Sequence, residues 1–328
     1  MHIPDGFLDA KTAIASGGLA VAGVGVALWQ AQRTLPARRV PLLGVTAAFI
    51  FAAQLLNFPV AGGTSGHLVG GVLAAVLVGP SAAVIVLTAV LLVQCFLFAD
   101  GGVTALGANI FNMGLVNVVA GSAIYRILRR LVAGPRGLVL GAAFAGWCAT
   151  VLAAVCCAGQ LAWSGKVAWR LVFPAMAGVH MLIGIGEGAI TALVLLAIVR
   201  VRPELVERNA VVPLPAATIG SGLLVALGLA LFVSPFACVW PDGLEKVAAK
   251  LGFDQHTVTT LPSAPFRGYQ LSWLGESGWG TALVGAIGTL AAFLIAFFLA
   301  RMLVPNSGTG VPPVNPSDTN RRDACPTN

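Results

Sequence analysis

Nine long apolar segments constrain this chain more than any other feature of its sequence. They are roughly 12–31, 40–57, 67–79, 81–99, 106–131, 138–163, 177–199, 213–234 and 279–304. Only 9% of the 328 residues are charged, against about 25% in soluble domains. Most segments reach the roughly 20 residues that a helix needs to cross a bilayer. The sequence therefore predicts an all-α, polytopic membrane protein.

The third segment, 67–79, is too short to cross a bilayer core of about 30 Å. Gly79 and Pro80 separate it from the fourth segment, so the two do not form one continuous helix. We expect it to be either a tilted segment or a half-helix whose free end lines a cavity, because irregular backbone inside a membrane must be buried in protein.

The chain divides into two modules and a tail. The first seven segments form a compact unit, residues 1–200, and the linker 201–215 carries four charges. Residues 201–304 form a second module, in which two spanning segments enclose a polar outer loop, 235–278. The tail, 305–328, is rich in Pro, Asn, Ser and Thr and is expected to be disordered. The predicted architecture is a seven-helix bundle plus two C-terminal transmembrane helices.

The basic residues predict which side of the membrane each end faces. With the N-terminus outside, 13 of the 19 Lys and Arg residues fall in the inner loops and the tail, as the positive-inside rule requires. The opposite orientation would place these clusters outside. The predicted orientation, chosen from the basic residues alone, places Met1, His2 and His67 together on the outer side.

The first two residues offer metal ligands before the chain folds. The α-amine of Met1, the amide nitrogen of His2 and the His2 imidazole close two fused chelate rings on one ion. They leave one corner of a square, which His67 could fill, and tetragonal nitrogen sites suit Ni(II) or Cu(II). Many chains begin Met-His without binding metal, so the case depends on the rest of the sequence. The bulk of His2 is expected to keep Met1 in place, and the formyl group must be removed before the amine can coordinate.

Three asparagines, Asn109, Asn112 and Asn117, lie in the fifth segment within one helical sector of about 140°. Buried amides need hydrogen-bond partners in hydrocarbon. Bonding between helices is the simpler interpretation, and orientation of His67 by these amides is the alternative.

His180 and Glu187 are seven residues apart and therefore share a helix face. Ionisable residues inside membrane segments usually face the bundle interior and are functional candidates. For Glu187, structural pairing and a role in coupling both stay open. For His180, a hydrogen-bonded histidine near the outer end is the simpler interpretation. Asp100 is expected to cap a helix or form a turn rather than to bind metal.

Motifs of three other function classes are missing from the sequence. It contains no GxxxxGK[ST] motif, so the chain does not hydrolyse ATP through a P-loop of its own. It contains no HExxH motif, which argues against a zincin-type membrane protease. No run of arginines at every third position indicates a voltage sensor. The chain is predicted to be a transport subunit rather than an enzyme.

Four motifs resemble those of one family, the cobalt/nickel substrate-binding (S) components of energy-coupling factor transporters, of the CbiM/NikM type. They are HIPDGF at 2–7, GHLVGG at 66–71, DGGVTALGANIFNMG at 100–114 and HMLIGIGEG at 180–188. The resemblance covers residues 1 to about 200. The second module resembles the NikN/PDGLE accessory component through the run PDGLE at 241–245.

The resemblance implies a metal site and a set of partners. In this family the N-terminus inserts into the bundle from outside, and the positions matching Met1, His2 and His67 supply the amine, amide and imidazole ligands. The family acts in the prokaryotic cytoplasmic membrane with a membrane coupling (T) component and two cytoplasmic ATPases. ATP hydrolysis there is thought to reorient the S component. Asn109, Asn112, His180 and Glu187 are candidates for supporting the site or coupling to it.

The predicted ligands favour Ni2+ or Co2+ as the transported substrate, with no organic cofactor. Only a strongly polarising ion can displace an amide proton, whereas Mg2+ and Ca2+ prefer oxygen ligands. Nickel and cobalt are not separated by these residues, although the fused accessory module favours nickel. One alternative is a self-sufficient secondary transporter or channel. It would need several carboxylates along a path through the membrane, and the sequence has essentially one, Glu187. The other is a membrane enzyme, for which no nucleophile–base motif is present.

Overall fold

The structure is a computed structural model that describes residues 1–206, 215–258, 264–271 and 278–304. Each apolar segment contains a helix, and the expected disordered tail, 305–328, lies outside the described residues. The helices are α1 (Ala10–Thr34), α2 (Val40–Gln54), α3 (Gly71–Val78), α4 (Pro80–Phe98), α5 (Leu106–Asn109), α6 (Asn117–Leu131), α7 (Gly134–Trp163), α8 (Trp169–Val201), α9 (Ala216–Gly228), α10 (Gly243–Leu251) and α11 (Gly278–Leu303). π-helical turns continue α5 into α6 (η2, Ile110–Val116) and extend α9 (η4, Leu229–Val233). Single 3-10 turns are η1 (Ala37–Arg39), η3 (Pro203–Leu205), η5 (Ser234–Phe236), η6 (Asp254–His256) and η7 (Arg267–Tyr269).

Seven helices in the described part of the chain are long and apolar enough to cross a membrane, five within residues 1–201 and two within residues 216–303. This finding confirms an all-α, polytopic membrane fold. The other two apolar segments form α2, with 15 residues, and α3, with 8 residues. At about 1.5 Å per residue, neither reaches about 30 Å. Both are largely buried, so they pack inside the bundle rather than against lipid.

The third apolar segment is a half-helix, one of the two predicted alternatives. α3 begins after Gly70, whose φ is 82°, and ends at Gly79, whose φ is 90°, directly before Pro80. Glycine adopts these positive φ values without the steric cost that other residues have. The chain turns sharply at Gly79, because Pro80 starts α4. The other end of α3, its N-terminal end, directly follows the segment that carries His67.

A short β-hairpin precedes α3 and was not predicted. Strands β1 (Phe58–Val60) and β2 (Thr64–Gly66) are antiparallel, with Pro59 opposite Ser65. The turn between them contains Gly62 and Gly63, with φ values of 81° and 68°. His67 directly follows β2, so the hairpin fixes where this imidazole enters the bundle.

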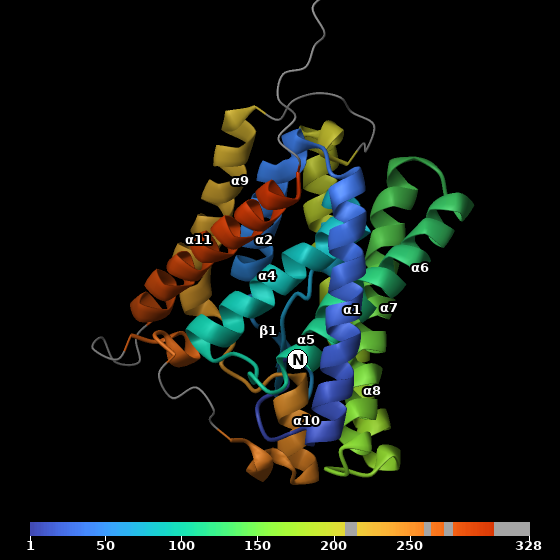
Figure 1. Ribbon diagram of the computed structural model, residues 1–328, viewed down its shortest axis with the longest axis vertical. Helices are drawn as coiled ribbons and strands as arrows, with labels where there is room; N and C mark the ends of the chain where they lie inside the picture. The colour runs from blue at the N-terminus through green and yellow to red at the C-terminus, as the bar shows by residue number, and fades with distance from the viewer. Residues whose placement is uncertain (207–214, 259–263, 272–277, 305–328) are drawn as a thin grey trace, which may run out of the picture.

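The C-terminal helices α9 and α11 lie against α2 at one side of the bundle (Figure 1). Glycines permit the close approach of α11 to its neighbours. A Cβ atom at Gly288 would lie only 2.2 Å from Cζ of Phe51. Small residues of this kind let helices in membranes approach closely.

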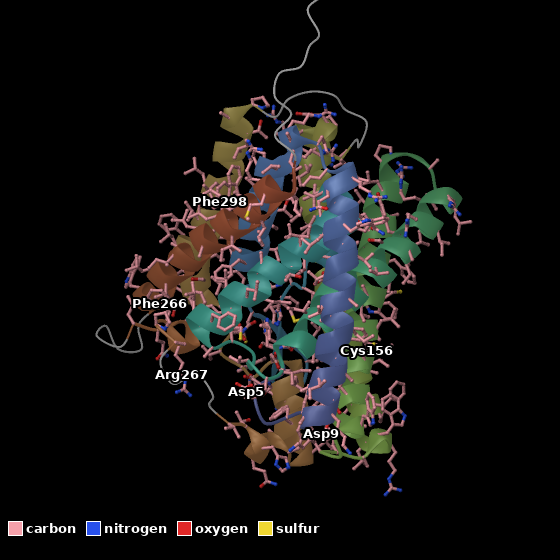
Figure 2. The ribbon with its side chains drawn as sticks, in the orientation of Figure 1. Asp5, Asp9, Cys156, Phe266, Arg267 and Phe298 are labelled. Carbon is pink, nitrogen blue, oxygen red and sulfur yellow. The ribbon has the colours of Figure 1, made fainter. Side chains whose placement is uncertain are left out.

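The two ends of the bundle differ in character. α1 runs along the bundle from the end that holds α10 to the turn before α2, and the N-terminus lies within the bundle on the α10 side (Figure 1). Asp5 and Asp9 lie at the end with α10 (Figure 2). The last turn of α1, which contains Arg33, is at the opposite end.

Candidate metal site

The first residues of the chain fold back into the bundle instead of extending from it. Ile3 is fully buried, and Met1 is 5% exposed. Asn109 holds both main-chain groups of Ile3: its Oδ1 accepts from the Ile3 N–H at 2.8 Å, and its Nδ2 donates to the Ile3 carbonyl at 3.1 Å. The N–H of Gly102 donates to the same carbonyl at 2.8 Å. Asn109 therefore positions the N-terminus rather than bonding to another helix.

Asp5 fastens the same segment to the loop before α5. Its carboxylate accepts from the backbone N–H groups of Val103 at 3.1 Å and Thr104 at 2.7 Å. A Cβ at Gly102 would lie 2.3 Å from the Asp5 nitrogen, so only glycine permits this approach. The motifs at 2–7 and 100–114 are thus two halves of one docking interface.

The Met1 amine lies between a histidine and a carboxylate. Its nitrogen is 2.9 Å from Nε2 of His67 and 2.6 Å from Oδ2 of Asp242. Nδ1 of His67 is 3.0 Å from the carbonyl oxygen of Leu68. Because a carbonyl can only accept, Nδ1 carries the proton of the neutral ring, and the lone pair of Nε2 faces the amine. Burial lowers the pKa of His67 well below its usual value, so the ring is neutral near pH 7.

A chain of amides sets the tautomer of His2. Gln54 Nε2 donates to the Val69 carbonyl at 2.9 Å, so Gln54 Oε1 accepts from Gln94 Nε2 at 2.7 Å. Because Gln94 uses its Nε2 in this bond, its Oε1 faces His2 and accepts from Nε2 of His2 at 3.1 Å. Burial lowers the pKa of His2, and in its neutral ring the lone pair falls on Nδ1. Nδ1 is the nitrogen that a chelate with the Met1 amine requires.

The two histidine rings lie face to face, with centroids 5.4 Å apart and planes inclined by 20°. Nδ1 of His2 is 3.3 Å from Oδ1 of Asp100, so in the neutral ring its lone pair faces a carboxylate oxygen instead of a donor. Asp100 therefore contacts the site directly, beyond the capping or turn role expected from the sequence. Its other oxygen accepts from the Tyr269 hydroxyl at 2.6 Å.

Glu187 anchors the segment that follows His67. Its two carboxylate oxygens accept from the N–H groups of Val69 at 2.6 Å and Gly70 at 3.0 Å, and the residue is fully buried. These N–H groups lie at the start of α3, where a helix leaves donors unsatisfied. Glu187 thus has a structural pairing, which was one of its two predicted roles.

The other predicted residues divide between the site and its surroundings. His180 reaches the site's edge: it lines a cavity of about 10 Å³ together with Met1, His67 and Asp242. Its Nδ1 is 2.8 Å from the Met176 carbonyl, and its buried Nε2 has no protein partner. Asn112 donates to Gln160 of α7 at 2.7 Å, which is the interhelical bond that the sequence favoured.

The architecture matches that of known transition-metal transporters. A family model described as cobalt uptake substrate-specific transmembrane region (CbiM) matches residues 2–205. The chain belongs to the CbiM family. A second family model, the PDGLE domain, matches residues 216–304 of this CbiM protein.

Relatives of this CbiM protein include fused chains of similar length. It is 35% identical to a putative fused nickel transport protein NikMN of Archaeoglobus fulgidus, over 92% of this chain and 98% of the relative. It is 30% identical to a probable fused nickel transport protein LarMN of Lactiplantibacillus plantarum, over 93% of this chain and 96% of the relative. A crystal structure of a truncated transition metal transporter superposes with a TM-score of 0.56 at 33% identity, covering 61% of this chain and 99% of that one.

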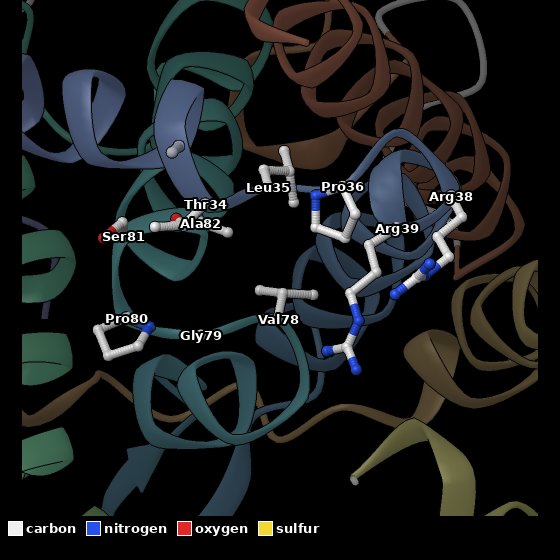
Figure 3. A pocket seen from close by; sticks show the side chains of 11 residues that line it. Thr34, Leu35, Pro36, Arg38, Arg39, Val78, Gly79, Pro80, Ser81 and Ala82 are labelled. Atoms are coloured by element: carbon white, nitrogen blue, oxygen red, sulfur yellow. The ribbon is translucent and has the colours of Figure 1, made fainter. Parts of the chain in front are cut away.

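Larger cavities in this CbiM protein lie away from the N-terminus. One of about 500 Å³ lies between the α1–α2 and α3–α4 turns and is lined by Arg38 and Arg39 (Figure 3). Another, of about 590 Å³, is lined by Arg126, Arg129 and Arg130. Guanidinium groups repel cations, so neither cavity suits a metal ion.

The described residues of this CbiM protein contain no group of three or more His, Cys, Asp or Glu side chains that could hold a metal ion. The candidate site consists instead of main-chain and terminal nitrogens with two imidazoles. Sequence reasoning missed Asp242, Gln54 and Gln94 at this site. The two glutamines could have been found, because amides inside apolar segments need partners.

Proposed function

We propose that this chain is the substrate-binding component of an ATP-driven energy-coupling factor importer for Ni2+ or Co2+. The observation that carries the proposal is the Met1 amine, buried beside the free lone pair of His67 Nε2 at 2.9 Å. Two nitrogens bound at about 2.0–2.1 Å to one ion, at adjacent corners of a square, lie about 2.9 Å apart. The amine and His67 thus have the spacing of neighbouring ligands.

His2 would supply the other two corners, through its amide nitrogen and Nδ1. The amine and the amide must both lose a proton when the ion binds, so affinity decreases as the pH falls. Burial lowers the pKa of both imidazoles, which favours the neutral rings that a metal ion requires. Asp100, 3.3 Å from Nδ1 of His2, would add a favourable charge beside the cation.

The arrangement of charge supports an N-terminus that faces outside in a prokaryotic cytoplasmic membrane. The N-terminus lies in the half of the bundle that carries α10, and the arginine-bearing α1–α2 turn lies at the opposite end (Figure 1). Positive loops favour the cytoplasmic side. The proposed modules are residues 1–200, which hold the site, and 201–304, and the separate family matches support this division.

Nickel is the favoured substrate, because the two fused relatives that cover both modules are named as nickel transport proteins. Energy would come from a T component and two ATPase subunits. A secondary transporter is less well supported, because Glu187, the carboxylate expected on its path, bonds with both oxygens to backbone N–H groups.

The dependence on partner ATPases can be tested by radioactive Ni2+ uptake. We expect cells that produce the chain with a coupling protein and its ATPases to accumulate the ion. Cells that produce the chain alone, or with ATPases whose P-loop lysine is replaced, should accumulate no more than the background. Equal uptake by the chain alone would contradict the proposal and favour a secondary transporter.

A further inference from the structure

The outer loop of the second module covers the candidate metal site. Ser65, two residues before His67, donates its N–H to the Pro241 carbonyl at 2.8 Å and its hydroxyl to the Trp240 carbonyl at 2.7 Å. The chain entering α10 is thereby held to β2. α10 itself lies at the same end of the bundle as the start of α1 (Figure 1).

The PDGLE run at 241–245 forms the contact with the site. Asp242 caps α10: its Oδ1 accepts from the N–H groups of Leu244 at 2.8 Å and Glu245 at 2.9 Å. Glu245 in turn accepts from the Asp242 N–H at 2.9 Å, which completes a capping box. The cap fixes the carboxylate so that its second oxygen, Oδ2, meets the Met1 amine.

Gly243 has a steric role in the same contact. A Cβ at this position would lie 2.8 Å from Cε1 of His180 and from Cδ1 of Ile183. Glycine therefore lets α10 approach α8 closely enough for Asp242 to reach the amine.

The inner face of α10 is apolar and packed. Leu244, Val247 and Ala248 are at most 2% exposed. Phe253, just after the helix, meets Phe7 edge to face with ring centroids 5.3 Å apart. Lys250, near the end of the helix, is exposed. The helix therefore has one face packed against α8 and the N-terminal segment and another towards solvent.

The covered site has no room for a hydrated ion. The cavity among Met1, His67, His180 and Asp242 has a volume of only about 10 Å³, roughly the space that one water molecule needs. An ion with its water shell does not fit into this space while α10 is docked.

We propose that residues 240–251 form a gate that must leave the site for metal to enter or escape, with the Asp242–Met1 ion pair as its latch. The proposal rests on the proposed function and assigns the accessory module a role in it: this module controls exchange at the metal site of the first module. The latch joins two residues 241 positions apart in sequence, so it exists only when the modules are docked.

A gate of this kind sets exchange rates more than affinity. Loosening its docked state exposes the site more often, so association and dissociation of the ion both become faster. A ligand substitution behaves differently, because it changes the equilibrium constant.

The test uses the purified full chain in detergent, with stopped-flow mixing of Ni2+ for association and excess EDTA for dissociation. Leu244→Ala removes buried contacts of the gate without altering charge, and Asp242→Asn keeps a good helix cap but removes the latch charge. We expect both rate constants to rise about tenfold or more in each variant, from the usual cost of removing a buried leucine or a buried charge partner. Lys250→Ala, on the exposed face of α10, should leave both unchanged.

The outcomes separate the gate from the function on which it rests. If Asp242→Asn speeds association alone, the carboxylate only competes with the ion for the amine, and the gate is wrong. If both variants exchange at the wild-type rates while binding still requires His67, the gate is again wrong but the proposed function stands. If Leu244→Ala binds no Ni2+ at all, the two exchange rate constants of Asp242→Asn decide alone whether the gate exists. A wild-type chain that binds no Ni2+, or binds it equally well without His67, would overturn the proposed function itself.

Discussion

Replacing His67 by alanine is expected to remove tight Ni2+ binding while the protein still folds and inserts. The imidazole supplies one corner of the proposed square, and the Leu68 carbonyl fixes its tautomer so that Nε2 faces the Met1 amine. Loss of a group that merely orients a ligand usually costs about 10–100-fold in metal affinity. Loss of the ligand itself should therefore cost more than about 100-fold, measured by calorimetric titration with Ni2+.

His256→Ala is the matched control for this variant. His256 is exposed and lies in the outer loop, outside the candidate site. Its removal should leave the affinity for Ni2+ unchanged. Unchanged affinity in His67→Ala as well would show that the ion binds elsewhere.

Adding Gly-Ser before Met1 is the second change with a large expected effect. The free amine then moves out of the chelate, and the added residues cannot fit where Met1 is 5% exposed and its nitrogen contacts both His67 and Asp242. We expect Ni2+ affinity to fall more than about 100-fold, as for loss of any ligand. Two residues are needed, because one added residue would make His2 the third residue. The new amine, two amides and the imidazole could then chelate nickel without His67.

The same two residues added after Asn328 serve as the control and should leave affinity unchanged. Mass spectrometry must show that each preparation begins as intended, with an unformylated Met1 in the wild type. Wild-type affinity in the chain extended at its N-terminus would eliminate the amine as a ligand.

Much of the fold follows from the sequence, because a bilayer limits which backbone structures can cross it. Long apolar runs can only be helices there, and Gly79 before Pro80 marks the break that makes α3 a half-helix. The β-hairpin before His67 and the helix α10 were missed. Both are short, and tertiary contacts rather than a long apolar pattern stabilise them.

The site was only partly predictable. The sequence places Met1, His2 and His67 on one side of the membrane, and in the structure they lie together. Their binding of metal stays a prediction. Asp242 was recognised as part of a motif, but its contact with the amine depends on the docking of a distant loop. No local pattern reports such a contact, since it arises from packing between modules.

The measurement that tests the central claim most directly is an absorption titration of the purified chain, with Met1 free, by Ni2+. A site of four nitrogens in a plane predicts a yellow, diamagnetic species that saturates at one Ni2+ per chain. A green or colourless paramagnetic complex would mean a different ligand set. An absence of binding at micromolar metal would remove the chelate altogether.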